Sequence, residues 1–225
     1  PPYSSAASDV YKRQVLDHHL ASEILPKCYA VVNPNRQDEV GNLSHLCAAA
    51  VVFLCLVEMR RLLRLNAEES PDLLNMLDLV ALATVADVAP LVGVNRAFVR
   101  QGLKILAGRK RIGLAALSDQ IKIDQELSAY HLGFLLGPRI NAGGRIGKSD
   151  LGAQLLTVQD LEAAKAMAER LDQLNFERRE LENQIKEAAL EQAINQKSFE
   201  SLAWAAGEAW HPGVVGIVAS RLKEA

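Results

Sequence analysis

Three consecutive residues that can bind a metal or a phosphate, Asp17, His18 and His19, directly follow the apolar pair Val15-Leu16. Neutral imidazole and carboxylate are both ligands of first-row transition metals, and a set that mixes them suits Mn, Fe or Zn. An apolar run that ends in polar residues is typical of a buried strand, and open α/β sheets place their sites at the carboxyl ends of strands. The alternative is a histidine pair on a solvated loop, and these residues alone do not decide between the two.

A second candidate ligand is Asp87, which ends an apolar segment that predicts a buried helix over residues 73–86. A carboxylate near a helix C-terminus faces the negative end of the helix dipole, and burial adds a desolvation cost. A metal ion could supply the compensating positive charge. Asp78 lies on the same predicted helix without an evident partner, so this argument alone leaves the role of Asp87 open.

A glycine-rich stretch, residues 139–149, follows a predicted helix over residues 129–136 that stops at Gly137-Pro138. We expect a loop in which glycines let backbone N–H groups approach an anion, while Arg139, Arg145 and Lys148 supply positive charge. The larger segment 96–148 carries ten Lys and Arg against three Asp and Glu, in a protein whose net charge is −2. This imbalance indicates either an anion-binding face or chance clustering on solvated helices.

Residues 159–196 have the pattern of one long, charged helix without glycine or proline. At ~1.5 Å per residue it would reach roughly 50 Å, the length of a connector between lobes and not of a packed core helix. A coiled-coil arm is the alternative, although its repeat is not sustained. Residues 202–206 then predict a strand, and residues 210–216 open a last helix whose N-terminal glycines favour a bound phosphate.

The composition is that of an ordinary globular protein, with 49% hydrophobic and 23% charged residues in 225. The three cysteines form no CxxC pair, which fits a reducing compartment, and no secretory signal is visible. The most apolar window, residues 73–92, is interrupted by Asp78, Asp87 and Pro90, which argues against a membrane span. We therefore expect a cytoplasmic protein without a membrane partner.

Four runs resemble, in order and spacing, the DHH phosphoesterase superfamily and, within it, the single-strand-specific 5′→3′ DNA exonucleases. They are the Asp-His-His of residues 17–19, ALATVADVAPL at 81–91, GPRINAGGR at 137–145 and WHPGVVGIVASR at 210–221. The resemblance covers residues 15–225. Asp-His-His marks only the superfamily, whereas the last two runs are more specific; Gly143 stands where those exonucleases usually have alanine.

The resemblance implies an α/β fold made of three parts. These are a helix-rich part of a DHH domain with a parallel sheet (residues 15–157), a long connector helix (158–198) and the start of a DHH-associated α/β domain (199–225). Residues 1–14 do not lead into a strand and are interpreted as a non-native scar. An Asp-x-Asp-Gly type motif before Asp-His-His and a glycine-rich signature near the end of the second lobe find no match, so we expect an incomplete piece of an exonuclease.

The resemblance also implies roles for particular residues and a two-metal Mn²⁺ or Mg²⁺ site whose ligands are partly missing from this chain. Among catalytic residues, Asp17 would support the cluster and His19 would contact the scissile phosphate, while His18 and Asp87 would be metal ligands. The expected nucleic-acid-binding residues are Arg139, Asn141, Arg145, Ser220 and Arg221.

The function implied is metal-dependent hydrolysis of single-stranded DNA from its 5′ end, in DNA repair and recombination. We expect a monomer, with a helicase or a single-strand-binding protein as the kind of protein partner. Two alternatives stay open: a phosphoesterase of the same superfamily acting on oligoribonucleotides, nucleoside bisphosphates or pyrophosphate, and a non-catalytic scaffold with the DHH fold.

Overall fold

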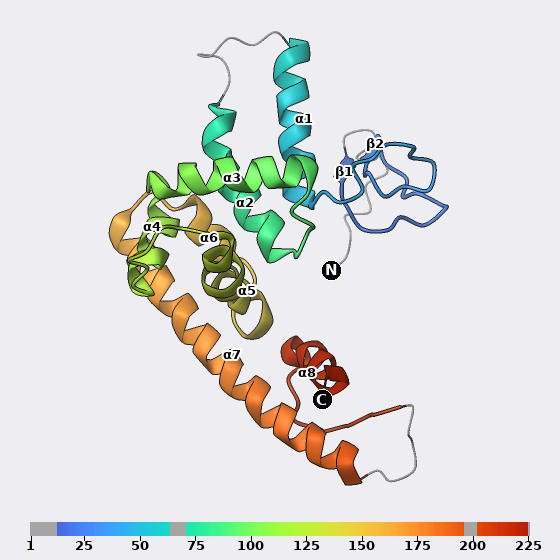
Figure 1. Ribbon diagram of the computed structural model, residues 1–225, viewed down its shortest axis with the longest axis vertical. Coiled ribbons are helices and arrows are strands. Elements are labelled where there is room, and N and C mark those ends of the chain that lie inside the picture. Colours follow the sequence, from blue (N-terminus) through green and yellow to red (C-terminus); the bar gives the residue numbers. More distant parts are fainter. Residues whose placement is uncertain (1–12, 64–70, 196–201, 225) are drawn as a thin grey trace. The chain divides into compact units, whose positions relative to one another are not determined.

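A computed structural model describes residues 13–63, 71–195 and 202–224 (Figure 1). Helices dominate, and a two-stranded parallel sheet completes the α/β fold expected from the sequence. The chain divides into two compact units: the first runs to Gly108 and includes Glu126–Gly133, and the second holds Arg109–Gln125 and the chain from Phe134 onward. No helix in these described ranges is both long and apolar enough to cross a membrane.

The sheet of the first unit pairs β1 (Gln14–Leu16) with β2 (Ala30–Val32), with Val15 opposite Val31. The strand that leads into Asp-His-His is therefore confirmed, and it includes Gln14, a residue of the segment 1–14 interpreted as a scar. Residues 1–12 lie outside the described residues. The expected burial of this strand is wrong. Leu16 is 39% and Val32 40% exposed, so the described elements leave much of this small sheet's faces uncovered.

Four helical elements complete the first unit: α1 (Ala48–Leu63), a 3₁₀ turn (Leu73–Met76), α2 (Leu77–Ala86) and α3 (Gly93–Ala107). The expected buried helix is confirmed in α2, which packs on α1, α3 and the 3₁₀ turn and is apolar on nearly every face. Asp72 caps the 3₁₀ turn, since its Oδ1 accepts a hydrogen bond from the Leu74 N–H at 3.1 Å. Asp78, in the first turn of α2, is buried at the positive end of the helix dipole.

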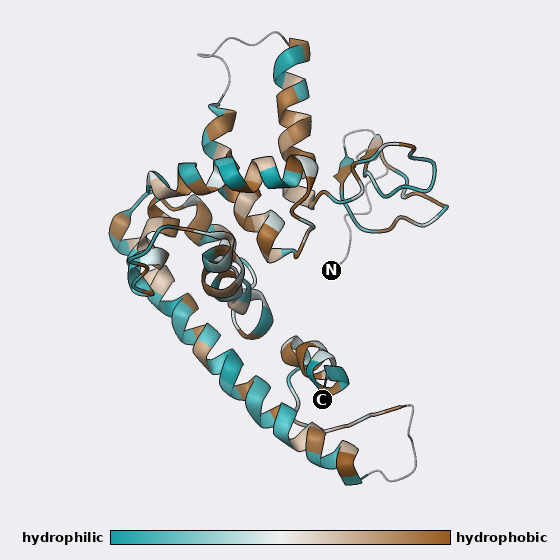
Figure 2. Cartoon of the chain, viewed as in Figure 1, coloured by the Kyte–Doolittle hydropathy of each residue, from teal (hydrophilic) through white to brown (hydrophobic). Residues whose placement is uncertain are grey.

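The second unit is built around one long helix, α7 (Leu161–Asn195), whose 35 residues extend about 52 Å. Around it lie α4 (Ile112–Gln120), α5 (Gly137–Ile146), α6 (Leu151–Thr157) and α8 (Pro212–Glu224). The length of α7 is confirmed, and Figure 2 shows it as largely hydrophilic. One of its faces is buried along both halves, and its role as a connector between lobes stays a prediction. The buried residues on that face include Ala164, Ala168, Leu171, Leu174, Ile185 and Ala189.

The expected glycine-rich loop after residue 138 is helical instead. A π-helical turn over His131–Leu136 leads directly into α5, in which Pro138 is the second residue. Pro138 has no N–H to donate, so the change from π-helical to α-helical bonding falls beside a residue that makes no such bond. Glycine weakens a helix by about 1 kcal/mol relative to alanine. In α5 that cost is offset by packing, since a Cβ at Gly143 would already lie 3.3 Å from the side chain of Leu171 on α7.

The strand expected over residues 202–206 does not form: residues 202–206 have neither helical nor strand structure. A side-chain amide takes the place of a neighbouring strand there. Gln192 on α7 donates from Nε2 to the Ala206 carbonyl at 3.0 Å, and its Oε1 accepts from the Ala206 N–H at 3.0 Å. An extended segment needs a partner for its backbone groups, and here one glutamine supplies both bonds.

Because α4 approaches α6 closely at Gly113, we expect one added methyl group there to change the stability of the fold strongly. A Cβ at Gly113 would lie 1.8 Å from the Leu155 carbonyl oxygen, whereas a Cβ at Gly144 would meet nothing within 4 Å. We expect Gly113→Ala to lower the free energy of unfolding by about 2–3 kcal/mol through overpacking, and Gly144→Ala to leave it unchanged or raise it by up to about 1 kcal/mol. Urea denaturation followed by circular dichroism measures both, and equal effects of the two substitutions would contradict this packing.

Candidate active site

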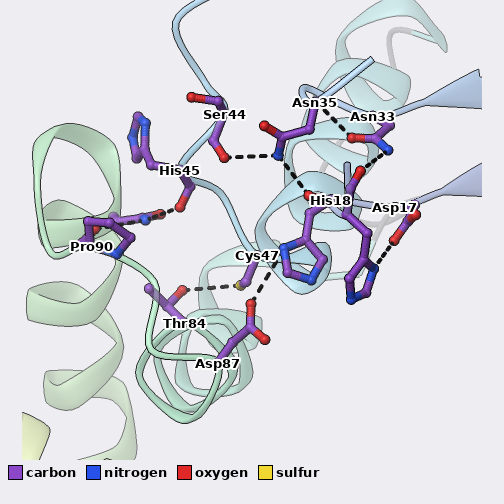
Figure 3. A network of polar contacts seen from close by, with 12 residues as sticks. Asp17, His18, Asn33, Asn35, Ser44, His45, Cys47, Thr84, Asp87 and Pro90 are labelled. Atoms are coloured by element: carbon purple, nitrogen blue, oxygen red, sulfur yellow. Dashed lines mark hydrogen bonds and ion pairs between the residues drawn. The ribbon is translucent and has the colours of Figure 1, made fainter. Parts of the chain in front are cut away.

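The Asp-His-His run lies at the carboxyl edge of the parallel strands (Figure 3). The Asp17 N–H donates to the Val32 carbonyl at 3.1 Å, which continues the strand pairing one residue beyond β1. The turn that ends β2 then holds the next two residues: Asn35 donates from Nδ2 to the His18 carbonyl at 2.7 Å, and Asn33 from Nδ2 to the His19 carbonyl at 2.8 Å. The local sequence thus places both imidazoles at the edge where parallel strands end.

The structure brings His18 and Asp87 together although they are far apart in the sequence. The Nδ1 atom of His18 lies 3.5 Å from Oδ2 of Asp87, and their side chains are 19% and 42% exposed. Asp87 follows the last residue of α2, and its N–H donates to the Ala83 carbonyl at 2.9 Å. The carboxylate therefore faces an imidazole at the helix C-terminus, as a candidate ligand pair requires.

The other two residues of the run pair with each other. Nδ1 of His19 donates to Oδ1 of Asp17 at 2.8 Å, and the His19 side chain is 77% exposed. This hydrogen bond raises the pKa of His19 and lowers the pKa of Asp17. With Nδ1 held by the carboxylate, Nε2 is the ring nitrogen of His19 that is left to meet a ligand.

Across residues 13–63, 71–195 and 202–224, no group of three or more His, Cys, Asp or Glu side chains could hold a metal ion. The pair of His18 and Asp87 supplies donors of the right chemical types for Mn²⁺ or Mg²⁺. A two-metal site needs more protein ligands than this pair. The described residues therefore fit part of a metal site, and further ligands would have to come from outside them.

The expected nucleic-acid-binding residues all lie in the second unit, and most are already engaged with protein groups. Arg139 donates from Nε to Asp172 at 2.7 Å and from Nη1 to the Leu135 carbonyl at 2.9 Å, and its side chain is only 17% exposed. It lies on α5 and not on a loop. Arg145, also on α5, donates to the Gly213 carbonyl of α8 at 3.0 Å.

The remaining expected residues are exposed. Asn141 lies on α5, and Ser220 and Arg221 lie on α8. Arg221 is within 3.9 Å of Glu182 on α7 and 3.3 Å of Glu224. These three side chains are accessible to a ligand, and their role in binding nucleic acid stays a prediction.

Trp210, which precedes α8, packs against the apolar cluster of Ile185, Ala189, Val214 and Val218. The N-terminal glycine of α8 is likewise engaged within the protein: the Gly213 N–H donates to Nδ1 of His211 at 3.1 Å. Both features are explained by packing and capping of α8.

Sequence reasoning missed a partly buried ion pair on α7. Arg178 lies 2.7 Å from Glu182, with side chains 12% and 15% exposed, and it also donates to Oδ1 of Asn175 at 3.1 Å. Burial lowers the pKa of Arg178, and the charge of Glu182 opposes that effect. The four-residue spacing of an arginine and a glutamate on one helix was the available signal.

Comparisons with known proteins agree with this geometry, although no protein-family model matches the chain. “Single-stranded-DNA-specific exonuclease RecJ” from Dickeya dadantii is 42% identical over 222 residues, which cover 93% of this chain and 38% of that protein. The crystal structure of RecJ from Thermus thermophilus in complex with Mn²⁺ has a TM-score of 0.79 at 34% identity, over 94% of this chain and 31% of that one. A structure of exonuclease RecJ bound to manganese has a TM-score of 0.80 at 34% identity, over 94% and 51%.

These similarities bear out the resemblance to single-strand-specific DNA exonucleases. The relatives are named RecJ, and the chain is similar to a segment that spans 38% of the length of the first curated relatives. The helix-rich α/β fold of the described residues is likewise that of the matching part of RecJ.

The pairing of Asp17 with His19 predicts a measurable titration. The raised pKa of His19 means that this pair stabilises the fold below the ordinary pKa of histidine and loses the effect as pH rises through the raised value. The lowered pKa of Asp17 means that the contribution is lost again as pH falls through that lowered value. We expect an NMR titration of His19 in the metal-free chain to show the raised pKa, and Asp17→Asn to return it toward the ordinary value, while Asp38→Asn leaves it unchanged.

The contacts of Arg139 predict a structural effect of its removal. Arg139→Ala removes the bond to Oδ1 of Asp172, whose Oδ2 keeps a 3.4 Å bond from Gln120, and the bond to the Leu135 carbonyl, so we expect the free energy of unfolding to fall by about 1–3 kcal/mol. Arg179→Ala, which removes an exposed arginine of α7, should change it by less than about 0.5 kcal/mol. Thermal denaturation of the two variants compares them, and a loss of DNA affinity at unchanged stability would instead support a role of Arg139 in binding.

Proposed function

We propose that this chain forms part of a site that hydrolyses phosphodiester bonds of single-stranded DNA from the 5′ end, with Mn²⁺ or Mg²⁺ as cofactor. The observation that carries the proposal is the approach of His18 to Asp87, at 3.5 Å, from two separate elements. Its support from known proteins is the similarity to RecJ, which is named as specific for single-stranded DNA and has been crystallised with Mn²⁺ and Mg²⁺. The biological setting would be DNA repair and recombination.

In this proposal His18 and Asp87 would be two of the metal ligands, through an imidazole nitrogen and a carboxylate oxygen. When bound, a divalent ion at such a site supplies a water of lowered pKa that serves as the nucleophile. Asp87 lies at the C-terminus of α2, where the helix dipole adds to the attraction for a cation.

The pair of Asp17 and His19 would act on the phosphate. Asp17 holds the imidazole through Nδ1 and raises the pKa of His19, which favours the protonated ring. A protonated His19 would donate from Nε2 to a phosphoryl oxygen and stabilise the negative charge that develops there. Its exposed position leaves that nitrogen accessible to a substrate.

Binding of the strand is assigned to the second unit. Asn141, Arg145, Ser220 and Arg221 would contact phosphate oxygens, which gives affinity without reading the base sequence. Arg139 belongs to the same expected set, but its bonds to Asp172 and Leu135 hold the guanidinium in place and its side chain is only 17% exposed. A non-catalytic scaffold is the second candidate, favoured by one observation: only two metal-competent donors converge among the described residues.

The ligand count predicts the behaviour of the 225-residue chain by itself. Because two converging donors cannot hold two ions with open positions for water, we expect little or no degradation of single-stranded DNA by this chain with Mn²⁺. Release of nucleotides from a labelled strand measures it, with the Dickeya dadantii relative as the positive control. A rate close to that of the relative would show that the chain carries a complete site.

A chimera tests the proposed activity directly. Residues 15–225 replace the matching segment of the Dickeya dadantii relative, and we expect the product to degrade single strands with Mn²⁺. His18→Ala or Asp87→Ala in the chimera should lower the rate at least about 100-fold, whereas Glu23→Ala, an exposed carboxylate between the two strands, should leave it unchanged. A folded but inactive chimera would favour the scaffold.

The choice of substrate separates the remaining alternative. The chimera is offered 5′-labelled single strands of decreasing length, a matching duplex and a nucleoside bisphosphate. Preference for long single strands supports the exonuclease, and preference for dinucleotides or the bisphosphate supports a small-substrate phosphoesterase of the same superfamily.

A further inference from the structure

One side-chain amide connects the backbone of the histidine run to a distant segment of the first unit. Nδ2 of Asn35 donates one hydrogen bond to the His18 carbonyl at 2.7 Å and another to the Ser44 carbonyl at 3.0 Å (Figure 3). Its backbone N–H in turn donates to Oδ1 of Asn33 at 2.8 Å, which fixes the turn that carries it. Asn35 thus holds the His18 peptide against the segment that precedes α1.

A second side-chain amide continues this connection to the other half of the site. Nδ2 of Asn95, on α3, donates to the His45 carbonyl at 2.7 Å and to the Pro90 carbonyl at 3.0 Å. Since Ser44 and His45 are neighbours, both side-chain amides donate hydrogen bonds to the same short segment. Pro90 lies in the turn that directly follows Asp87, so the network reaches from one candidate ligand to the other.

We propose that Asn35 and Asn95 are positioning residues that set the separation of His18 and Asp87 through this shared segment. Only the ligand role of that pair rests on the proposed function; the geometric role does not. Neither asparagine touches the imidazole or the carboxylate itself. Each acts on the peptide that carries or follows a ligand, and therefore on the direction in which the side chain leaves the backbone.

The residue type is explained by the number of donors. A carboxamide nitrogen carries two hydrogens and can bind two carbonyls at once, whereas a hydroxyl has one hydrogen and an ionised carboxylate has none. Asn95 is entirely buried, and its Oδ1 has no hydrogen-bond partner among the described residues. The donors, and not the acceptor, thus connect Asn95 to its neighbours.

The test replaces each amide by the carboxylate of the same shape in the full 225-residue chain. Asn35→Asp and Asn95→Asp remove both donors, and Asn42→Asp, on the same loop region but exposed, is the control for the added charge. The first readout needs no metal: nuclear Overhauser effects between the His18 ring and the Asp87 side chain. We expect them in the wild type and in Asn42→Asp and expect their loss in the other two variants, with unchanged helical circular dichroism.

The second readout is the affinity for Mn²⁺, followed by paramagnetic broadening of the His18 and Asp87 signals. We expect it to fall at least about 10-fold in Asn35→Asp and Asn95→Asp. An added negative charge alone would strengthen cation binding, so a loss reports on geometry, and Asn42→Asp should show none.

The two readouts separate the two claims. Unchanged Overhauser effects in both Asn35→Asp and Asn95→Asp overturn the positioning role, whatever the change in affinity for Mn²⁺. Absence of Mn²⁺ broadening at His18 in the wild type contradicts the proposed metal site, and the Overhauser effects still decide the positioning role. If Asn95→Asp does not fold, Asn35→Asp, whose side chain is less buried, decides it alone.

Discussion

The burial of α2 on nearly every face determines where Asp87 can lie. This helix packs on α1, α3 and the preceding 3₁₀ turn, and Thr84 near its end is fully buried with its Oγ1 3.4 Å from Sγ of Cys47. A helix held in this way cannot rotate or slide without breaking its packing. The carboxylate at its C-terminus therefore occupies one place, and the strand end that carries His18 has to reach that place.

Two kinds of polar interaction hold the site together, and they differ in charge and in exposure to solvent. The imidazole–carboxylate pairs, His18 with Asp87 and His19 with Asp17, are local and partly exposed, so water and salt weaken them. The amide-to-carbonyl bonds beneath them are uncharged and include two buried asparagines, Asn33 and Asn95. The asparagine-to-carbonyl bonds therefore hold the backbone more rigidly than the ion pairs do, and this backbone carries the candidate ligand side chains.

Several arginines of the second unit form hydrogen bonds and ion pairs within the protein. Arg139 connects α5 to α7 through Asp172, Arg145 connects α5 to α8, and Arg178 lies partly buried beside Glu182. The basic segment seen in the sequence supplies residues to both units. An arginine whose donors are already used by protein groups has fewer left for phosphate.

The sequence by itself determined the elements with strong local signals: the strand that ends in Asp-His-His, the buried helix that ends at Asp87, and the long charged helix α7. It also indicated which side chains could bind a metal, because residue type and position at the end of an element are local properties. Tertiary structure alone decided that residues 137–146 are helical, since packing of Gly143 against Leu171 outweighs the low helix propensity of glycine. It alone decided that Arg139 pairs with Asp172, because contacts between distant segments depend on how whole elements pack and leave no pattern in either segment. The approach of His18 to Asp87 was implied by the resemblance, and the packing of whole elements decided its geometry.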